Sequence, residues 1–464
     1  MPAYRTVTDA TAALHAGEVT AVQLVDGALA RADALDDELG VFLDRYSDAA
    51  RVAAAAADAD LAAGRDLGPL HGIPLGIKDI ISTADGPTTA QSLVLDPQWG
   101  EQTGDAVVIS RLRDAGAILV GKTTTMEYAL GPPDPDKPFP IPRNPWDRKA
   151  WAGGSSSGTG SGVATGMFLA GLGTDTGGSI RIPSAYCGIT GLKPTFGRVP
   201  KSGCFPLGFT LDHIGPMARS ARDCAVLLGV IAGYDASDPY AADQPVDDYV
   251  GALTGELSGL RIGVDRLTKA SAGAIDPAQP DRFEAALAVL ADAGARVVDV
   301  KLPYYAEMCT VDMLAMVTEA MAIHRSDLRA RWSDYGAGTR YLIGTSVFYT
   351  AADYVQAQRV RRVGQLALAD LFTSVDLVVT PTSTQGAPSL ESLYPVWGRA
   401  GYAGLHTTYW SASGSPTASV PIGFTEAGLP LAMQISGRPW AEGTVLAAAD
   451  AFQQRTDFHL RSPS

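Results

Sequence analysis

The chain has 464 residues, of which 46% are hydrophobic and 19% are charged, a composition typical of folded globular proteins and not of disordered ones. Lysine and arginine number 36 against 50 aspartates and glutamates, so the formal charge of −14 argues against general affinity for nucleic acid or anionic membranes. The N-terminus has no basic start followed by an apolar run, and no apolar stretch is long enough to span a bilayer. We therefore expect a cytoplasmic protein that binds small molecules, with no nucleic-acid or membrane partner.

The N-terminal residues 1–65 predict helices. Thr20 has the side chain of a helix N-cap and precedes an amphipathic run over 21–35. Ser47 stands in the same position before an alanine-rich run that ends near Gly64. We expect both runs to pack against the rest of the protein through their apolar faces.

Beyond these helices, short apolar runs alternate with helical segments, which is typical of an α/β fold. The expected strands cover residues 73–77, 117–120, 260–264, 296–300, 377–380 and 431–435, and expected helices cover 105–115 and 281–293. The sequence contains no domain-sized linker and no internal repeat. These observations favour one large α/β domain.

The most informative stretch, residues 152–179, reads AGGSSSGTGSGVATGMFLAGLGTDTGGS and holds ten glycines and five serines. A flexible linker has this composition, but the apolar run over 163–172 argues against one. Glycines let backbone amides approach a ligand closely and adopt positive φ. A serine beside such a turn is a candidate nucleophile. The consecutive amides that can point at one oxyanion are those of Thr176, Gly177, Gly178 and Ser179.

Two motifs in this stretch carry a resemblance to a known family. GGSS at 153–156 is followed, 24 positions after Ser155, by the serine of GGSIR at 177–181. Together they resemble the amidase signature. The resemblance extends to GIPLGIKD at 72–79 and TLDHIGPMARSARD at 210–223, and more weakly to GSPTASVPIGF near the C-terminus. It therefore covers nearly the whole chain.

The resemblance implies an α/β fold with a large mixed β-sheet covered by helices on both faces, in one domain over residues 1–464. Within it, 1–65 supply N-terminal helices, 71–220 the signature core with the catalytic residues, and 221–464 the remaining elements and the substrate-pocket loops. It implies hydrolysis of carboxamide C–N bonds through an acyl-enzyme, with esters, carbamates and urethanes as further substrates. It also implies no metal and no organic cofactor, and it is compatible with a homodimer.

The resemblance implies a catalytic triad in which Ser179 is the nucleophile, Ser155 the bridging serine after a cis peptide bond, and Lys78 the base, with Ser156 supporting the site. The chemistry is coherent without it, because a neutral amine at Lys78 can accept a proton from Ser155 while Ser155 accepts one from Ser179. A free lysine titrates near 10.4, so burial away from carboxylates must lower the pKa of Lys78. Asp79 must therefore point away from it, as alternation along a strand would place it.

Further residues are expected around this triad. Asp175 is expected to pair with Arg181, close to the nucleophile. An apolar or aromatic substrate would suit the large side chains near the matched motifs, although ordinary core packing explains these side chains equally well. The candidate substrate-binding residues are Tyr128, Leu130, Trp151, Phe205 and Phe209.

Two other motifs point to different classes of enzyme. The letters of residues 116–123 satisfy a P-loop, but the four middle residues are apolar and favour a buried strand with a structural Lys122. GSSSG at 154–158 satisfies the nucleophile elbow of α/β-hydrolases, which would make Ser156 the nucleophile of an esterase, with His406 or His459 downstream as its partner. The polar residues before this motif do not predict the strand that an elbow requires.

A further alternative is the amidase subunit of the glutamyl-tRNA amidotransferase, which would bring protein partners. The segment GYAGLHTTYWSASGSP lacks the acidic residue expected ahead of it for binding the amino group of glutamine, which favours a stand-alone hydrolase. The four cysteines and six histidines show neither CxxC nor metal-ligand spacing. We therefore expect no disulfide framework and no metal site.

Overall fold

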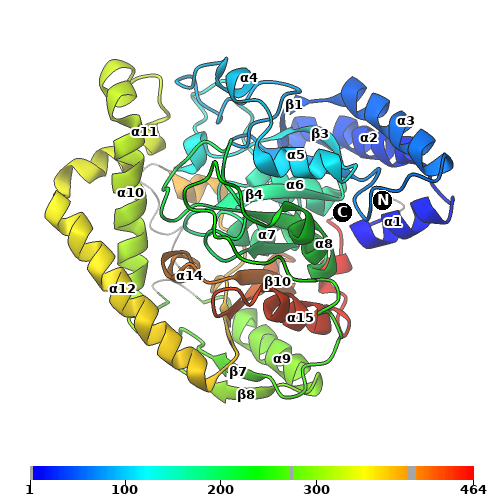
Figure 1. Ribbon diagram of the computed structural model, residues 1–464. Helices are drawn as coiled ribbons and strands as arrows, with labels where there is room; N and C mark the ends of the chain where they lie inside the picture. The colour runs from blue at the N-terminus through cyan, green and yellow to red at the C-terminus, as the bar shows by residue number, and fades with distance from the viewer. Residues whose placement is uncertain (1–3, 272–274, 395–403, 464) are drawn as a thin grey trace.

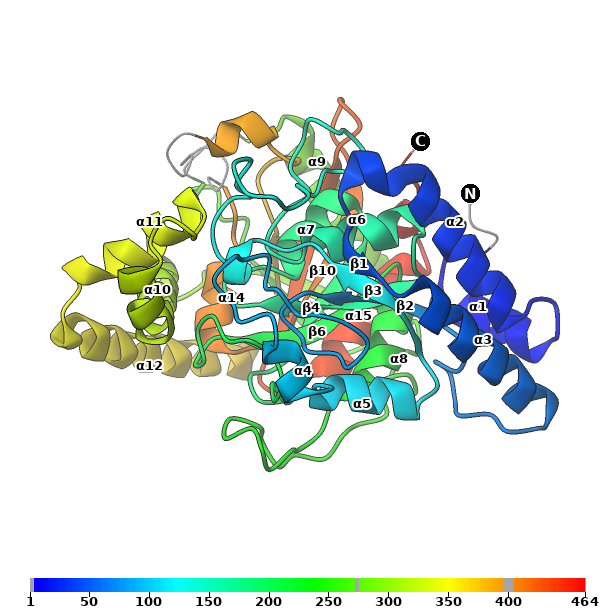
Figure 2. The same ribbon diagram turned by 90° about the horizontal axis from the view of Figure 1, so that it is seen from above.

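The computed structural model describes residues 4–271, 275–394 and 404–463. In these ranges eleven strands form one mixed sheet, which runs through the middle of the molecule in Figures 1 and 2. In sheet order the strands are β1 (Phe42–Arg45), β3 (Ile118–Thr123), β2 (Pro74–Lys78), β4 (Ala170–Asp175), β6 (His213–Ala218), β5 (Thr190–Lys193), β10 (Thr417–Phe424), β11 (Pro430–Gly437), β9 (Leu377–Pro381), β7 (Arg261–Val264) and β8 (Arg296–Asp299). The predicted large mixed sheet is confirmed.

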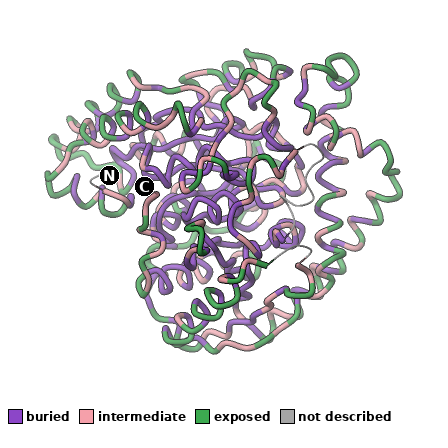
Figure 3. The backbone as a smooth tube through the Cα atoms, turned by 180° about the vertical axis from the view of Figure 1, so that it is seen from behind, coloured by how far each residue is buried: buried purple, intermediate pink, exposed green. Residues whose placement is uncertain are grey.

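Helices surround this sheet. Every residue of β2, β3, β4 and β6 is buried, and because successive side chains point to opposite faces, both faces are covered. Figure 3 shows buried backbone in the interior and exposed backbone at the periphery of the molecule. The helices are α1 (Val7–His15), α2 (Ala21–Leu39), α3 (Ser47–Ala62), α4 (Trp99–Thr103), α5 (Val107–Asp114), α6 (Ser157–Thr165), α7 (Arg181–Cys187), α8 (Ala221–Ile231), α9 (Ala278–Asp292), α10 (Tyr305–Ala330), α11 (Ala337–Thr345), α12 (Ala351–Ser374), α14 (Thr408–Ser413) and α15 (Glu442–Gln453), with short 3-10 turns η1 (Glu127–Ala129), η2 (Ser346–Phe348), η3 (Leu390–Leu393) and η4 (Phe458–Leu460).

The two predicted N-terminal helices are present, but only one begins as expected. Thr20 caps α2 in a reciprocal pair, since its hydroxyl accepts from the Gln23 amide at 3.1 Å and the Gln23 side chain accepts from the Thr20 amide at 3.0 Å. The predicted cap at Ser47 is wrong. Ser47 is already the first residue of α3, because Tyr46 donates its amide to Val120 in β3 and the chain turns directly into the helix.

The sheet combines two parallel parts with an antiparallel middle. Strands β3, β2 and β4 run parallel, as do β9, β7 and β8, and the strands between β4 and β9 pair antiparallel. The six expected strands correspond to β2, β3, β7, β8, β9 and β11. In β2, Ile77 pairs with Lys122 on one side and with Leu172 on the other. This arrangement places β2 inside the sheet, with its last residue, Lys78, between two neighbouring strands.

A helical layer lies beside one end of the sheet. The long helices α10 and α12 pack on each other and on α14, and in Figure 1 they stand out at one side of the molecule. In the described part of the chain, no helix combines the length and the apolar character that crossing a bilayer requires. The layer matters for the site because α10 and α14 approach the loop that follows β4.

Candidate functional site

The three residues of the expected triad meet at one edge of the sheet. Lys78 is the last residue of β2, Ser155 lies in the turn before α6, and Ser179 lies in the loop between β4 and α7. Strands β2 and β4 are parallel neighbours, so their carboxyl ends share one edge, where ligands of open α/β sheets bind. The fold therefore gathers residues that are far apart in the sequence.

Hydrogen bonds connect these three residues, one between side chains and one through a backbone amide. The Lys78 Nζ atom lies 2.6 Å from Ser155 Oγ, and the Ser155 backbone amide donates to Ser179 Oγ at 3.1 Å. Lys78 and Ser155 are fully buried, whereas Ser179 is partly exposed. A group arriving from outside would therefore meet the Ser179 hydroxyl first, with the amine behind it.

The environment of Lys78 favours the neutral amine. Burial lowers its pKa to about 7, while Cys204, Asp175 and Asp212 act weakly in the opposite direction. Besides Ser155, its Nζ atom contacts Thr174 Oγ1 at 2.6 Å.

Asp79 points away from this amine, as expected from strand alternation. One carboxylate oxygen lies 3.3 Å from Lys122 Nζ, and the other accepts from the Thr89 amide at 3.0 Å. Lys122 in turn donates to Thr88 Oγ1 at 2.7 Å and lies within the fully buried strand β3. Lys122 is thus structural, and the P-loop interpretation is wrong.

The loop that follows β4 is shaped by Asp175. Its carboxylate pairs with Arg181 at 2.9 Å, as expected, and accepts from the Gly178 amide at 2.8 Å. Burial acts to raise the pKa of Asp175, but the Arg181 guanidinium holds it below its usual range. The Gly178 amide is therefore already engaged, which corrects its expected place in the oxyanion hole. Within the described ranges, the amides of Thr176, Gly177 and Ser179 donate to no acceptor.

Ser156 supports the strand behind the site. Its hydroxyl donates to the Thr174 carbonyl and accepts from the Thr174 amide, both at 3.1 Å. A Cβ added at Gly173 would lie only 2.7 Å from this hydroxyl, so a glycine is needed there. His406 is instead bonded to Tyr305 at 2.6 Å, and His459 lies in η4. No described histidine bonds to Ser156, so the nucleophile-elbow interpretation is wrong.

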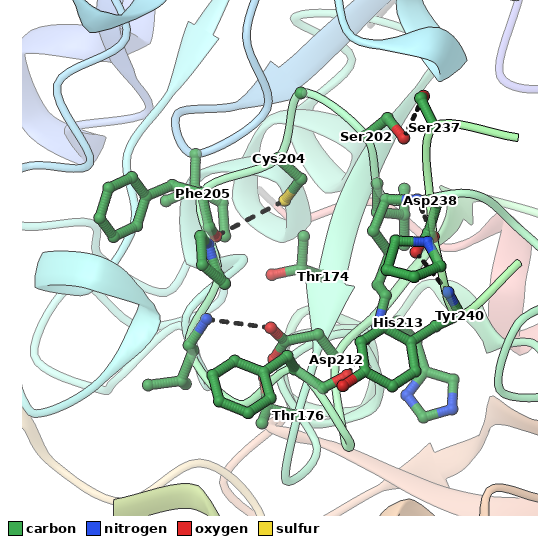
Figure 4. A pocket seen from close by; sticks show the side chains of 18 residues that line it. Thr174, Thr176, Ser202, Cys204, Phe205, Asp212, His213, Ser237, Asp238 and Tyr240 are labelled. Atoms are coloured by element: carbon green, nitrogen blue, oxygen red, sulfur yellow. Dashed lines mark hydrogen bonds between the residues drawn. The ribbon is translucent and has the colours of Figure 1, made fainter. Parts of the chain in front are cut away.

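A cavity of about 250 Å³ reaches the site from the side of Thr174 and Thr176. Figure 4 shows these threonines with Cys204, Phe205 and Asp212 on its walls. Asp212 accepts from Thr176 Oγ1 at 2.7 Å, and burial raises its pKa. One of the residues that line the cavity is thus Thr174, whose hydroxyl contacts Lys78.

The five candidate substrate-binding residues occupy different places. Phe205 and Phe209 line the cavity, and the Tyr128 ring lies 4.9 Å from the Phe205 ring. Leu130 and Trp151 are buried in the core and are not among the lining residues. Thr174 and Asp212 were missed by sequence reasoning. Thr174 lies in the glycine-rich stretch 152–179 and Asp212 in the matched motif at 210–223, so a search of these segments for polar side chains would have found both.

Comparisons with known proteins identify the family of this chain. The sequence model of the family named Amidase matches residues 23–446. A glutamyl-tRNA(Gln) amidotransferase subunit of Roseiflexus sp. (strain RS-1) is 41% identical, covering 99% of this chain and 98% of its own. An amidase of Pseudomonas putida is 38% identical, covering 97% and 96%. The native peptide amidase from Stenotrophomonas maltophilia superposes with a TM-score of 0.85 at 31% identity, covering 100% and 99%. The chain belongs to the amidase family.

Proposed function

We propose that this protein is an amidase, a hydrolase of carboxamide C–N bonds, in which Ser179, Ser155 and Lys78 form the catalytic triad. The observation that carries the proposal is the buried Lys78 amine, 2.6 Å from Ser155 and turned away from Asp79. A lysine whose pKa burial lowers to about 7 serves as a general base near neutral pH. Family membership supports the same reaction.

The proposed reaction begins with attack of Ser179 Oγ on the amide carbonyl carbon. The Ser179 proton passes to Ser155 Oγ, which gives its own proton to Lys78 Nζ. The tetrahedral oxyanion accepts hydrogen bonds from the amides of Thr176, Gly177 and Ser179, which donate to no other described group. Collapse breaks the C–N bond, the leaving amine takes the proton returned through Ser155, and water then hydrolyses the acyl-enzyme by the same relay.

A second candidate function is that of the amidase component of an amidotransferase. Its support is the 41% identity, over nearly the full length, with the amidotransferase subunit of Roseiflexus. The absence of an acidic residue in the segment 401–416 favours the stand-alone enzyme; residues 401–403 lie outside the described ranges. Turnover by the purified chain alone distinguishes the two, since an amidotransferase component would need a partner protein and glutamine.

The proposal also covers the range of substrates, the domain organisation, the location and the oligomeric state. We include esters and carbamates, because the relay that activates Ser179 does not depend on the leaving atom. We also propose a single domain over residues 1–464, a cytoplasmic location and a homodimer. Light scattering of the purified protein tests the oligomeric state, and a monomeric mass would contradict it.

The experiment that tests the nucleophile is labelling with a small fluorophosphonate. Intact-mass analysis should show one adduct, and peptide mapping should place it on Ser179. Ser179→Ala should lose both the adduct and amide turnover. The matched control is Ser161→Ala, which removes a buried α6 hydroxyl that bonds to no described group and should keep both. An adduct on Ser156, or turnover retained by Ser179→Ala, would contradict the proposal.

A further inference from the structure

Asp312 is a buried carboxylate in α10 that has no hydrogen-bond partner on either oxygen among the described residues. Its side chain is 0% exposed. Buried polar groups are nearly always hydrogen-bonded, and an unpaired buried charge is costly. A carboxylate kept in this condition requires an explanation, because a neutral side chain would stabilise the fold better.

This carboxylate lies next to the loop between β4 and α7, which carries the proposed oxyanion amides. A Cβ added at Gly177 would lie 3.2 Å from Asp312 Oδ2 and 3.6 Å from Thr408 Cγ2. The Gly177 carbonyl is fixed by Thr407 Oγ1 at 2.6 Å. Asp312 in α10 therefore faces the Cα of Gly177, whose amide is proposed to hold the oxyanion. The start of α14 lies beside it.

The nearest cations do not satisfy this carboxylate. Arg361 donates to the Ala412 carbonyl at 2.7 Å and to the hydroxyl and carbonyl of Thr210 at 3.1 and 3.0 Å. Arg181 is bonded to Asp175 and to neighbouring polar groups. Burial raises the pKa of Asp312 although both arginines oppose it. Among the described residues, no donor therefore bonds to either of the two oxygens.

We propose that Asp312 is a specificity-determining residue that accepts hydrogen bonds from a protonated amino group of the substrate, next to the scissile carbonyl. An ammonium fits better than a neutral N–H group, because it supplies several donors and also the opposite charge. Since the Gly177 amide is proposed to hold the carbonyl oxygen while its Cα faces Asp312, the amino group belongs on the acyl part, close to the carbonyl carbon. No bond is made or broken at Asp312. The inference rests on the proposed function, because it takes Ser179 as the nucleophile.

Two amides of nearly equal shape test this inference. Alaninamide carries an ammonium where isobutyramide carries a methyl group, so kcat/KM for the wild type should favour alaninamide by about tenfold or more, the value of one good charged hydrogen bond. Asp312→Asn keeps the shape and removes the charge. It should lower kcat/KM for alaninamide by about tenfold, mainly through KM, and leave isobutyramide within about twofold. Asp327→Asn, an exposed charge change on the same helix, is the control and should alter neither.

The outcomes separate this inference from the proposed function. Fluorophosphonate labelling of Ser179 should persist in Asp312→Asn. Equal losses on both amides would assign Asp312 a structural role and overturn the inference. If Asp312→Asn failed to fold, the wild-type ratio of kcat/KM for alaninamide to that for isobutyramide would decide. A ratio of one or below would overturn the inference. Failure of the wild type to label at Ser179 would instead overturn the proposed function.

Discussion

Two buried lysines on neighbouring strands show how the fold separates a base from a structural cation. Lys78 ends β2 and Lys122 lies in β3, and both side chains are 0% exposed. The register pairs Ile77 with Lys122, so Lys78 and Lys122 point to opposite faces of the sheet. On one face Lys78 meets the hydroxyls of Ser155 and Thr174; on the other, Lys122 meets the Asp79 carboxylate.

The two lysines are equally buried, but they differ in the groups that their amines contact. Burial lowers the pKa of both amines, but at Lys122 the Asp79 carboxylate acts directly against it. At Lys78 the nearest contacts are neutral hydroxyls. A buried amine without a carboxylate can shed its proton and act as a base, whereas a paired one keeps its charge and fixes the surrounding loop.

The largest expected effect comes from Lys78→Met, which removes the base while keeping a side chain of similar length. Amide turnover should fall by about a thousandfold or more, since general-base assistance contributes roughly 10² to 10⁴. The free energy of unfolding should stay the same or rise, because an unpaired buried amine is replaced by an apolar group. Steady-state kinetics and urea unfolding test both parts; retained turnover would show that Lys78 is not the base.

Lys122→Met should have the opposite effect, a loss of stability while the nucleophile remains reactive. It leaves Asp79 buried without its cation, which typically costs about 3 to 5 kcal/mol of stability. The remaining folded protein should still label at Ser179. The double variant Lys122→Met with Asp79→Asn should recover part of the lost stability, because the unpaired charge is removed as well. No recovery in urea unfolding would show that Asp79 and Lys122 are not coupled.

The pH dependence sharpens the comparison further. Because burial depresses the pKa of Lys78, its protonated form dominates only below about 7. Activity should therefore rise with pH and level off once the amine is neutral, with the midpoint of kcat/KM near 7. A profile measured from mildly acidic to alkaline buffers tests this. A rise centred near the ordinary lysine pKa would mean that the base is not desolvated.

The smallest effect is expected for Thr174→Val, which removes one hydroxyl from Lys78 at constant shape. A hydrogen bond of this kind contributes about 1 kcal/mol. Because the charged amine loses an acceptor, the pH midpoint of kcat/KM should fall by less than about one pH unit. The control is Thr159→Val, which removes another buried hydroxyl, paired with Thr123. It should not change the pH midpoint of kcat/KM. A shift to higher pH would contradict the assigned hydrogen bond.

The sequence predicted the apolar strands and the motif residues better than the strands rich in glycine and proline. β2 and β3 contain apolar runs that indicate burial on their own. β4 (AGLGTD) and β6 (HIGPMA) mix glycine, proline and polar residues with few large apolar ones. They form because neighbouring strands bury them, which single-sequence patterns do not record. These two strands were missed although both lie beside the site.

The candidate site shows the same limit. Lys78, Ser155 and Ser179 stand in matched motifs, and the structure brings them together. Four consecutive amides were expected at the oxyanion, but which way each amide points depends on the path of the loop, and Asp175 takes the one at Gly178. Asp312 comes from a helix far along the chain, and no pattern near it indicates that its carboxylate reaches this loop.

The position of Lys78 at the end of an internal strand ties its motion to the opening of the whole sheet. Ile77 beside it is paired on both sides, with Lys122 and Leu172. Active-site groups often lie on segments that open locally, at little cost. Here the backbone amides around Ile77 should exchange with deuterium only when the protein unfolds globally. Heat should therefore inactivate the enzyme at the temperature where it melts, with no earlier loss of a loosened catalytic base.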